Sequence, residues 1–190
     1  MRGPVRKELM KCFERELKAR WPQFTLFDSE PNTRIWSWRI SPHLVLFVMV
    51  HAFQGEDQFS VEVAWSETEE FPYGAVGQVK VDQPQGREGL GLLWESDPHP
   101  LHPPSPARVE HVWDAAPEKT AGILQDLEAL REGKAMSFPP DPPLAQTLPR
   151  VLPLVRDAVD KLEEYGMGLF RRVAEVRGVD WPGASTAAHG

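Results

Sequence analysis

Histidine and aspartate side chains gather in one stretch of the sequence, where they could bind a metal ion or move protons. They are Asp97, His99, His102, His111 and Asp114. Neutral imidazoles and carboxylates are suitable zinc ligands. Two histidines three residues apart usually share a face by lying on a helix, and Pro100 and Pro103 exclude a helix here. We therefore predict no metal site, and we keep a small hydrolase or metal-dependent enzyme using residues 97–114 as the alternative function.

Motifs for nucleophilic catalysis and phosphate binding do not occur in the sequence. It contains neither a G-x-S-x-G elbow nor a G-x-x-x-x-G-K-[ST] loop. Cys12, the one cysteine, lies beside Phe13 on the apolar stripe of a predicted helix, which indicates a core residue. It can form no disulfide within the chain, and this favours a reducing compartment. We predict no catalytic residue, no cofactor and a cytoplasmic location.

The charge of the chain excludes some kinds of partner. Its 28 acidic and 21 basic residues give a formal net charge of -7, whereas tracking a nucleic-acid backbone takes clustered Lys and Arg. The longest apolar run, Leu44 to Val50, is far shorter than the ~20 residues of a membrane-spanning helix. We therefore predict neither nucleic-acid nor membrane binding. The stretch from Gln54 to Phe71 has no Lys or Arg and six acids, which are Glu56, Asp57, Glu62, Glu67, Glu69 and Glu70.

A helix and four strands are predicted for the first third of the chain. Apolar residues recur every four positions between Val5 and Leu17, which predicts a helix over residues 4–20. Apolar alternation and one nearly continuous apolar run predict strands over residues 24–28, 34–40, 44–53 and 58–66. Short connections between the later strands favour antiparallel pairing as a meander.

Helices are predicted to close the chain after an irregular middle. Short strands are predicted over residues 79–81, 89–94 and 108–113, with a Pro-rich loop near 96–107. A helix follows over residues 117–132. Another starts at Pro149 with Pro153 in its first turn, and a break at residues 165–168 separates it from a last helix. We thus predict one α+β domain over residues 1–178, an antiparallel meander sheet packed against an N-terminal helix and C-terminal helices. A flexible tail is predicted over 179–190.

Two tryptophans of a predicted strand could form a contact surface. Trp36 and Trp38 share one face of the strand because side chains alternate between its faces. Strand aromatics generally pack against helices, so most tryptophans are expected in the core. The pair would give an aromatic platform only if nothing covers it.

The chain resembles a known group of proteins in three segments and in the order of its predicted elements. The segments are Trp36–Ile40, Phe59–Trp65 and Glu164–Phe170. Over residues 4–178 the chain resembles small bacterial α+β proteins of unknown function that are associated with polymorphic toxin loci. Several such families are taken to be immunity proteins. The resemblance implies a toxin-neutralising protein that binds and occludes its cognate toxin, and it transfers no catalytic residue.

An acidic surface would suit such an inhibitor, because it can steer and hold a basic toxin. The predicted partner-binding residues are Glu56, Asp57, Glu67, Glu69, Glu70, Trp36 and Trp38. The acids flank the predicted strand at 58–66, so we expect two acidic rims, one at each end of that strand. The sequence leaves the identity of the toxin and the oligomeric state open.

Overall fold

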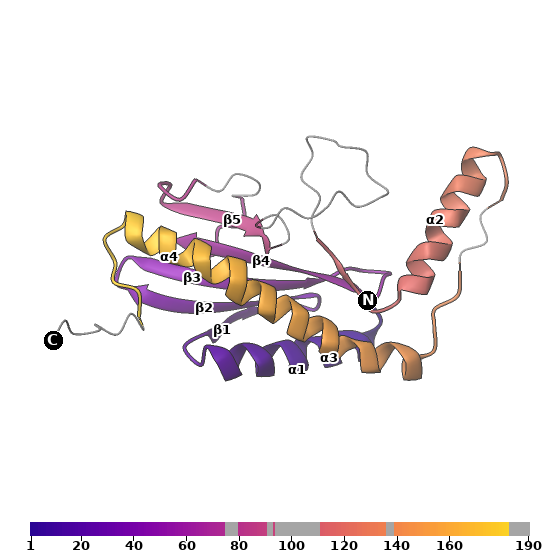
Figure 1. Cartoon of the computed structure of the whole chain (residues 1–190), viewed down its shortest axis with the longest axis horizontal. Coiled ribbons are helices and arrows are strands. Elements are labelled where there is room, and N and C mark those ends of the chain that lie inside the picture. Colours follow the sequence, from indigo (N-terminus) through magenta and orange to yellow (C-terminus); the bar gives the residue numbers. More distant parts are fainter. Residues whose placement is uncertain (75–79, 91–92, 94–110, 136–138, 183–190) are drawn as a thin grey trace.

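The computed structural model describes residues 1–74, 80–90, 93, 111–135 and 139–182 (Figure 1). The helices in these ranges are α1 (Gly3–Arg20), α2 (Pro117–Arg131), α3 (Leu144–Lys161), the π-helical turn η2 (Leu162–Gly166) and α4 (Met167–Val176). The strands are β1 (Thr25–Ser29), β2 (Thr33–Ser41), β3 (Leu44–Ala52), β4 (Gln58–Ser66), β5 (Gln85–Gly89) and β6 (Trp113–Asp114).

The strands form one antiparallel sheet in the order β1-β2-β3-β4-β5, and β6 pairs with the start of β4. In the tight β3–β4 connection, Gly55 has a φ of 81°, which a residue with a side chain rarely adopts. Helices α1, α3 and α4 lie along the sheet, whereas α2 projects away from it (Figure 1). The predicted α+β class, with a meander sheet packed against N- and C-terminal helices, is confirmed.

Side chains that alternate along the strands build two cores, one on each face of the sheet. On the helix side, Val48 and Val63 are wholly buried in a cluster that includes residues of α1, α3 and α4. On the opposite side, the ring of Phe47 packs edge-on against Phe71, with ring centroids 5.4 Å apart. Strand β3 contributes to both cores, and this explains its nearly continuous apolar run.

Trp36 and Trp38 belong to the helix-side core, so the exposed aromatic platform is not formed. Trp36 is wholly buried and stacks on Phe13 of α1, with ring centroids 5.5 Å apart. Trp38 is 7% exposed and contacts the rings of Phe24 and Trp181. The helices and the segment after α4 cover this sheet face, and Trp36 is thereby removed from contact with a partner.

Helix α3 begins five residues before the predicted start. Its first residue is Leu144, so Pro149 and Pro153 both lie inside the helix and not in its first turn. Each proline removes one hydrogen bond to the preceding turn. The helix is stable despite these losses, because its apolar side, including Val151 and Val155, is buried in a core that also contains residues of α1.

The predicted break at residues 165–168 is absent, because the backbone runs through η2 directly into α4. A Cβ atom on Gly166 would lie 2.5 Å from Cδ1 of Leu162 and 3.3 Å from Cγ1 of Val63. Glycine at this position therefore allows the helix to approach the sheet closely, and it does not end the helix.

Strand β5 has no counterpart in the sequence-based prediction. A Cβ atom on Gly86 would lie 2.3 Å from the indole ring of Trp65, which crosses this strand. The glycine that resembles a loop residue is thus required for packing. Of the short predicted strands, Lys80 and Val81 lie outside any strand, Gly89 ends β5 and Trp113 begins β6. Residues 79, 91–92, 94 and 108–110 and the loop at 96–107 lie outside the described residues.

Candidate functional site

The predicted acidic rims lie at opposite ends of β4. Glu56 and Asp57 precede the strand, and Glu67, Glu69 and Glu70 follow it. A nine-residue strand spans about 30 Å, so the two groups cannot form one continuous contact patch.

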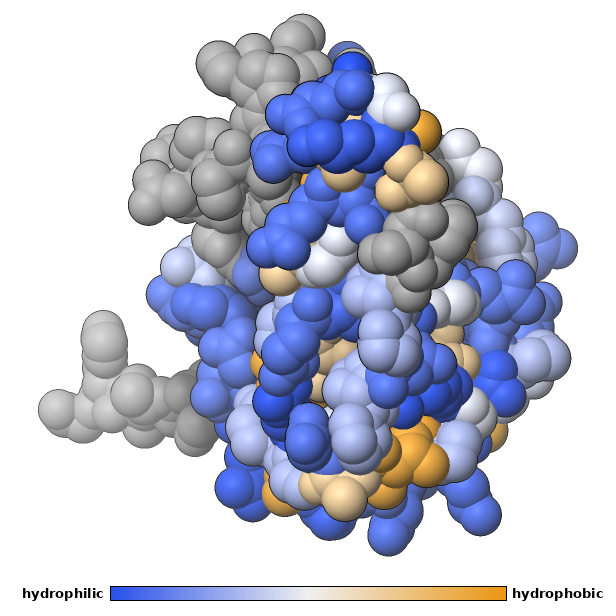
Figure 2. All heavy atoms as spheres, turned by 90° about the vertical axis from the view of Figure 1, so that its right-hand side faces the viewer, coloured by the Kyte–Doolittle hydropathy of each residue, from blue (hydrophilic) through white to orange (hydrophobic). Residues whose placement is uncertain are grey.

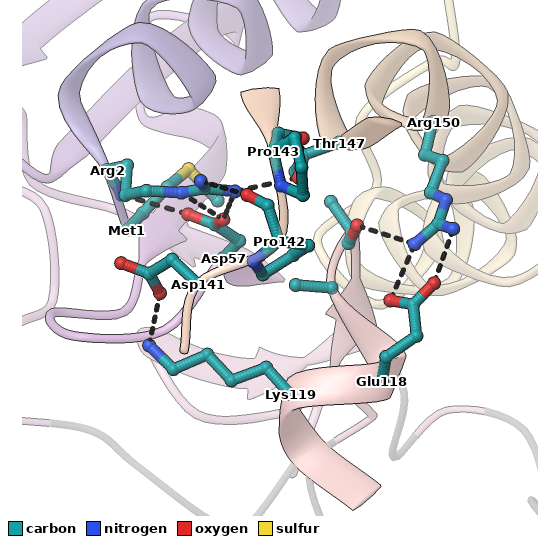
Figure 3. A network of polar contacts seen from close by, with 12 residues as sticks. Met1, Arg2, Asp57, Glu118, Lys119, Asp141, Pro142, Pro143, Thr147 and Arg150 are labelled. Atoms are coloured by element: carbon teal, nitrogen blue, oxygen red, sulfur yellow. Dashed lines mark hydrogen bonds and ion pairs between the residues drawn. The ribbon is translucent and has the colours of Figure 1, made fainter. Parts of the chain in front are cut away.

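At the first rim, Asp57 is buried and joins distant segments of the chain. Its carboxylate accepts hydrogen bonds from the backbone N–H of Arg2 at 2.9 Å and from Nε of Arg2 at 2.7 Å. The same guanidinium donates to Oγ1 of Thr147 at 2.7 Å and to the carbonyl oxygen of Pro142 (Figure 3). Asp57 therefore holds α1, β4 and the start of α3 together, and its carboxylate is not available to a partner.

Ion pairs near Asp57 attach the first turn of α2 to other segments of the chain. Lys119 pairs with Asp141 at 2.6 Å, and Arg150 pairs with Glu118 at 2.5 Å (Figure 3). The hydrogen bonds from Arg150 are the main cause that lowers the pKa of the Glu118 carboxyl from 4.5 to about 2. These contacts attach α2 to the segments before and within α3.

The outer part of α2 remains exposed to solvent. None of its residues is buried, and Leu127 and Leu130 are 43% and 51% exposed. Figure 2 looks at this end of the molecule and shows hydrophilic side chains over most of the described surface, with hydrophobic ones mainly along the lower edge. This end of the described molecule is thus mostly polar.

The second rim is exposed but largely neutralised. Glu67 pairs with Arg177 at 2.8 Å, and Glu69 pairs with Arg39 at 2.6 Å. Glu62 forms a two-pronged ion pair with Arg87 within the sheet. The one-sided acidity of residues 54–71 is therefore balanced by arginines from distant parts of the chain, which local composition cannot reveal.

The predicted histidine and aspartate cluster is only partly described. Asp97, His99 and His102 lie outside the described residues. Asp114 accepts hydrogen bonds from the backbone N–H of Ala116 and from the side chain of Thr120, so it organises the start of α2. Within the described ranges, no three His, Cys, Asp or Glu side chains are grouped so that they could hold a metal ion.

Cys12 is a buried core residue, as its position beside the apolar stripe predicts. Its thiol donates a hydrogen bond to Oε1 of Glu8 at 3.2 Å. Burial, followed by this bond and the charge of Glu8, raises the pKa of the Cys12 thiol above its usual value. The thiol is therefore kept protonated and away from reagents.

A hollow at the opposite end from α2 is built around the end of α4. Gly178 has a φ of 62° and ends the helix, with the N–H of Val179 donating to the carbonyl oxygen of Ala174 at 2.9 Å. The chain then turns back, and Trp181 packs edge-on against Trp38 with ring centroids 5.3 Å apart. Val179 and Trp181 pack against the core, so the packed chain continues past the predicted start of the flexible tail.

We call this hollow the tryptophan groove, and its volume is about 870 Å³. The side chains of Met167, Arg171 and Glu175 are spaced four residues apart and line it from one face of α4. The other lining residues come from the turn after α1, from β2 and from the segment after α4: Trp21, Gln23, Trp38, Gly178, Val179, Asp180, Trp181 and Pro182.

Charged groups in the tryptophan groove are arranged differently from those of the rims. The guanidinium carbon of Arg171 lies 5.8 Å from the ring centroid of Trp181. Glu175 and Asp180 are exposed, and neither forms an ion pair with another described residue. Among the described residues that line the groove there is no Ser, Cys, His or Lys. The described lining therefore combines aromatic surface with carboxylates that pair with no other described residue, and it contains none of the usual nucleophiles.

Of the predicted partner-binding residues, the structure places only Trp38 in the tryptophan groove. The sequence-based prediction missed Trp21 and Trp181. Trp21 ends a predicted helix and Trp181 falls in a predicted tail, where an aromatic residue has no periodic pattern around it. A tryptophan in an otherwise polar tail is the one signal that could have indicated packing there.

A smaller pocket of about 160 Å³ lies on the other sheet face, between β1, β2, β3 and the loop before β5. The hydroxyl of Tyr73 donates to Oδ2 of Asp28 at 3.1 Å, and Oγ1 of Thr33 lies 2.9 Å from Nδ1 of His51. These four polar side chains thus bind one another in pairs, and Ile35 and Met49 supply the apolar part of the lining.

Comparisons with known proteins give no relative for this chain. No family model matches it, and neither a curated protein nor a solved structure is significantly similar to it. No helix in the described part is both long and apolar enough to cross a bilayer.

Proposed function

We propose that this chain is a protein-binding module and that the tryptophan groove is its main contact surface. The observation that carries the proposal is an open groove walled by Trp21, Trp38 and Trp181. Its edge carries Glu175 and Asp180, which form no ion pair with another described residue. Tryptophan supplies much of the binding energy at protein interfaces, because it buries a large apolar area with little loss of side-chain freedom.

The chemistry of the lining favours binding over turnover. The ionisable residues of its described lining are Arg171, Glu175 and Asp180, and these described residues offer no hydroxyl, thiol or imidazole for nucleophilic catalysis. The acidic rim after β4 adjoins the groove, because Arg177, the partner of Glu67, immediately precedes Gly178. We include Glu67, Glu69 and Glu70 as flanking contacts, whereas Asp57 is assigned a structural role.

The particular form that we propose is an immunity protein that neutralises a cognate toxin in the cytoplasm by covering its surface. Support for this form comes from the order of elements and the three segments that carry the resemblance. An inhibitor that works by occlusion requires a contact surface and no reaction of its own, and the tryptophan groove meets that requirement.

The test is co-expression with the product of the neighbouring gene, followed by co-purification and a growth assay. We expect the wild-type chain to bind that protein and to protect the host cell. Trp181→Ala should weaken binding about 30-fold or more, as removal of a central interface tryptophan does. Leu127→Ala is the matched control, because Leu127 is an exposed apolar residue of α2, far from the groove.

Two results would overturn the proposal. One is equal binding and protection by the Trp181→Ala variant and the wild type. The other is loss of binding in the Leu127→Ala variant alone. Circular dichroism of each variant establishes that a loss of binding is not a loss of folding.

A further inference from the structure

The aromatic rings and charges of the tryptophan groove favour one chemical class of ligand. We infer that the groove accepts a cationic side chain, arginine or lysine, from an extended segment of the partner protein. This inference rests on the proposed function and adds the class of group that the groove recognises.

The aromatic walls are suited to a cation. Arg171 already places its guanidinium over Trp181 at 5.8 Å, which shows that this ring can take a planar cation on its face. Trp21 is half-buried, and no described ring or cation is stacked on it. Its ring therefore provides a further aromatic surface in the lining of the groove.

The charges of the lining are complementary to a cation. Two carboxylates, Glu175 and Asp180, stand against one guanidinium, Arg171, so the lining carries a net charge of -1. Arg177, which immediately precedes Gly178, is bound to Glu67 and therefore does not neutralise these acids. At the rims, the carboxylates of Asp57, Glu67 and Glu69 already have an arginine partner. The groove thus offers an incoming cation carboxylates that lie beside aromatic rings.

The groove is partly open to solvent, and its volume of about 870 Å³ is much larger than one side chain, which fits an extended segment that inserts a basic residue. A purely apolar segment would use the tryptophans but would leave Glu175 and Asp180 without a partner. The two kinds of segment are therefore distinguished by whether removing the positive charge weakens binding.

The experiment titrates the full chain, labelled with ¹⁵N, with the peptide acetyl-Gly-Pro-Arg-Pro-Gly-amide and follows the indole N–H signals by NMR. The matched peptide carries citrulline, the neutral analogue of arginine, at the centre. Trp21→Phe and Trp181→Phe assign the two groove signals. We expect the signals of Trp21 and Trp181 to move and those of buried Trp65 and Trp113 to stay.

The arginine peptide should bind about fivefold more tightly than the citrulline peptide. In the double variant Glu175→Gln, Asp180→Asn this preference should disappear while the Trp65 signal stays in place. Equal binding of the two peptides, binding of neither, or shifts confined to other indoles would each overturn the inference. If Trp181→Ala still abolishes binding of the natural partner in that case, the proposed function stands and only the cationic ligand is wrong.

Discussion

At the residue scale, the role of a carboxylate depends on the residues that it contacts in the folded chain more than on its neighbours in the sequence. Asp57 and Glu69 belong to the same acidic stretch. Asp57 is buried and tied to Arg2, whereas Glu69 lies at the surface with a side chain 80% exposed. Removing the charge of a buried partner leaves the other charge uncompensated, whereas exposed pairs contribute little.

We therefore expect Asp57→Asn to lower the free energy of unfolding by about 2 kcal/mol or more, because it leaves the Arg2 guanidinium without its counter-charge. Glu69→Gln, the matched control, should change it by less than about 0.5 kcal/mol. Urea unfolding followed by circular dichroism measures both. Equal effects of the two substitutions would contradict the structural role assigned to Asp57.

Cys12 gives a second prediction at this scale. Because burial and Glu8 raise the pKa of its thiol, we expect native protein at pH 8 to react with iodoacetamide about a hundredfold more slowly than unfolded protein. The reaction is followed by mass spectrometry, with the chain in guanidinium chloride as the reference. Rapid modification of the native chain would place Cys12 at the surface.

At the element scale, elements with a strong local pattern are predictable from the sequence and those fixed by close packing are not. Helix α1 and strand β4 have regular apolar periods, and their predicted bounds agree with the structure to within a residue. Strand β5 and turn η2 depend on Gly86 and Gly166, whose missing side chains make room for Trp65 and Leu162. No local pattern distinguishes such a glycine from one in a loop.

The contrast between Gly166 and Gly168 tests this interpretation of the C-terminal helices. A Cβ atom on Gly166 would meet Leu162 and Val63, whereas one on Gly168 would meet nothing within 4 Å. Gly166→Ala should therefore destabilise the protein by about 1–2 kcal/mol. Gly168→Ala should stabilise it by about 0.5–1 kcal/mol through its helix propensity. The denaturant concentration at the midpoint of unfolding measures both effects. Stabilisation by both substitutions would contradict the close packing at η2.

The ion pair between Glu118 and Arg150, which attaches the first turn of α2, should weaken at low pH. The pKa of Glu118 is lowered to about 2 by Arg150, below the 4.5 of a free glutamate, so the unfolded chain binds this proton first. The pair thus contributes fully above about pH 4.5 and its contribution is lost as the pH falls toward 2.

We expect the ¹³C signal of the Glu118 carboxyl to titrate near pH 2 in the wild type and closer to pH 4.5 in Arg150→Gln. The stability difference between the wild type and Glu118→Gln should shrink over the same range. A wild-type midpoint near 4.5 would mean that Arg150 does not hold Glu118 in solution.

At the scale of the whole molecule, the two ends differ in what they offer to a partner. The α2 end is held by ion pairs and presents mostly hydrophilic side chains (Figures 2 and 3). The other end carries the tryptophan groove, whose carboxylates pair with no other described residue. The fold class was predictable, but the groove was not, because it brings together Trp21, Trp38 and Trp181 from three distant parts of the chain.

Contact through the tryptophan groove is tested most directly by hydrogen–deuterium exchange of the chain, free and in complex with the partner that co-expression identifies. We predict that binding slows exchange most at residues 21–23 and 171–182, with little change in α2. Protection confined to α2 or to residues 97–114, with the groove exchanging as in the free chain, would contradict a binding module that acts through the groove.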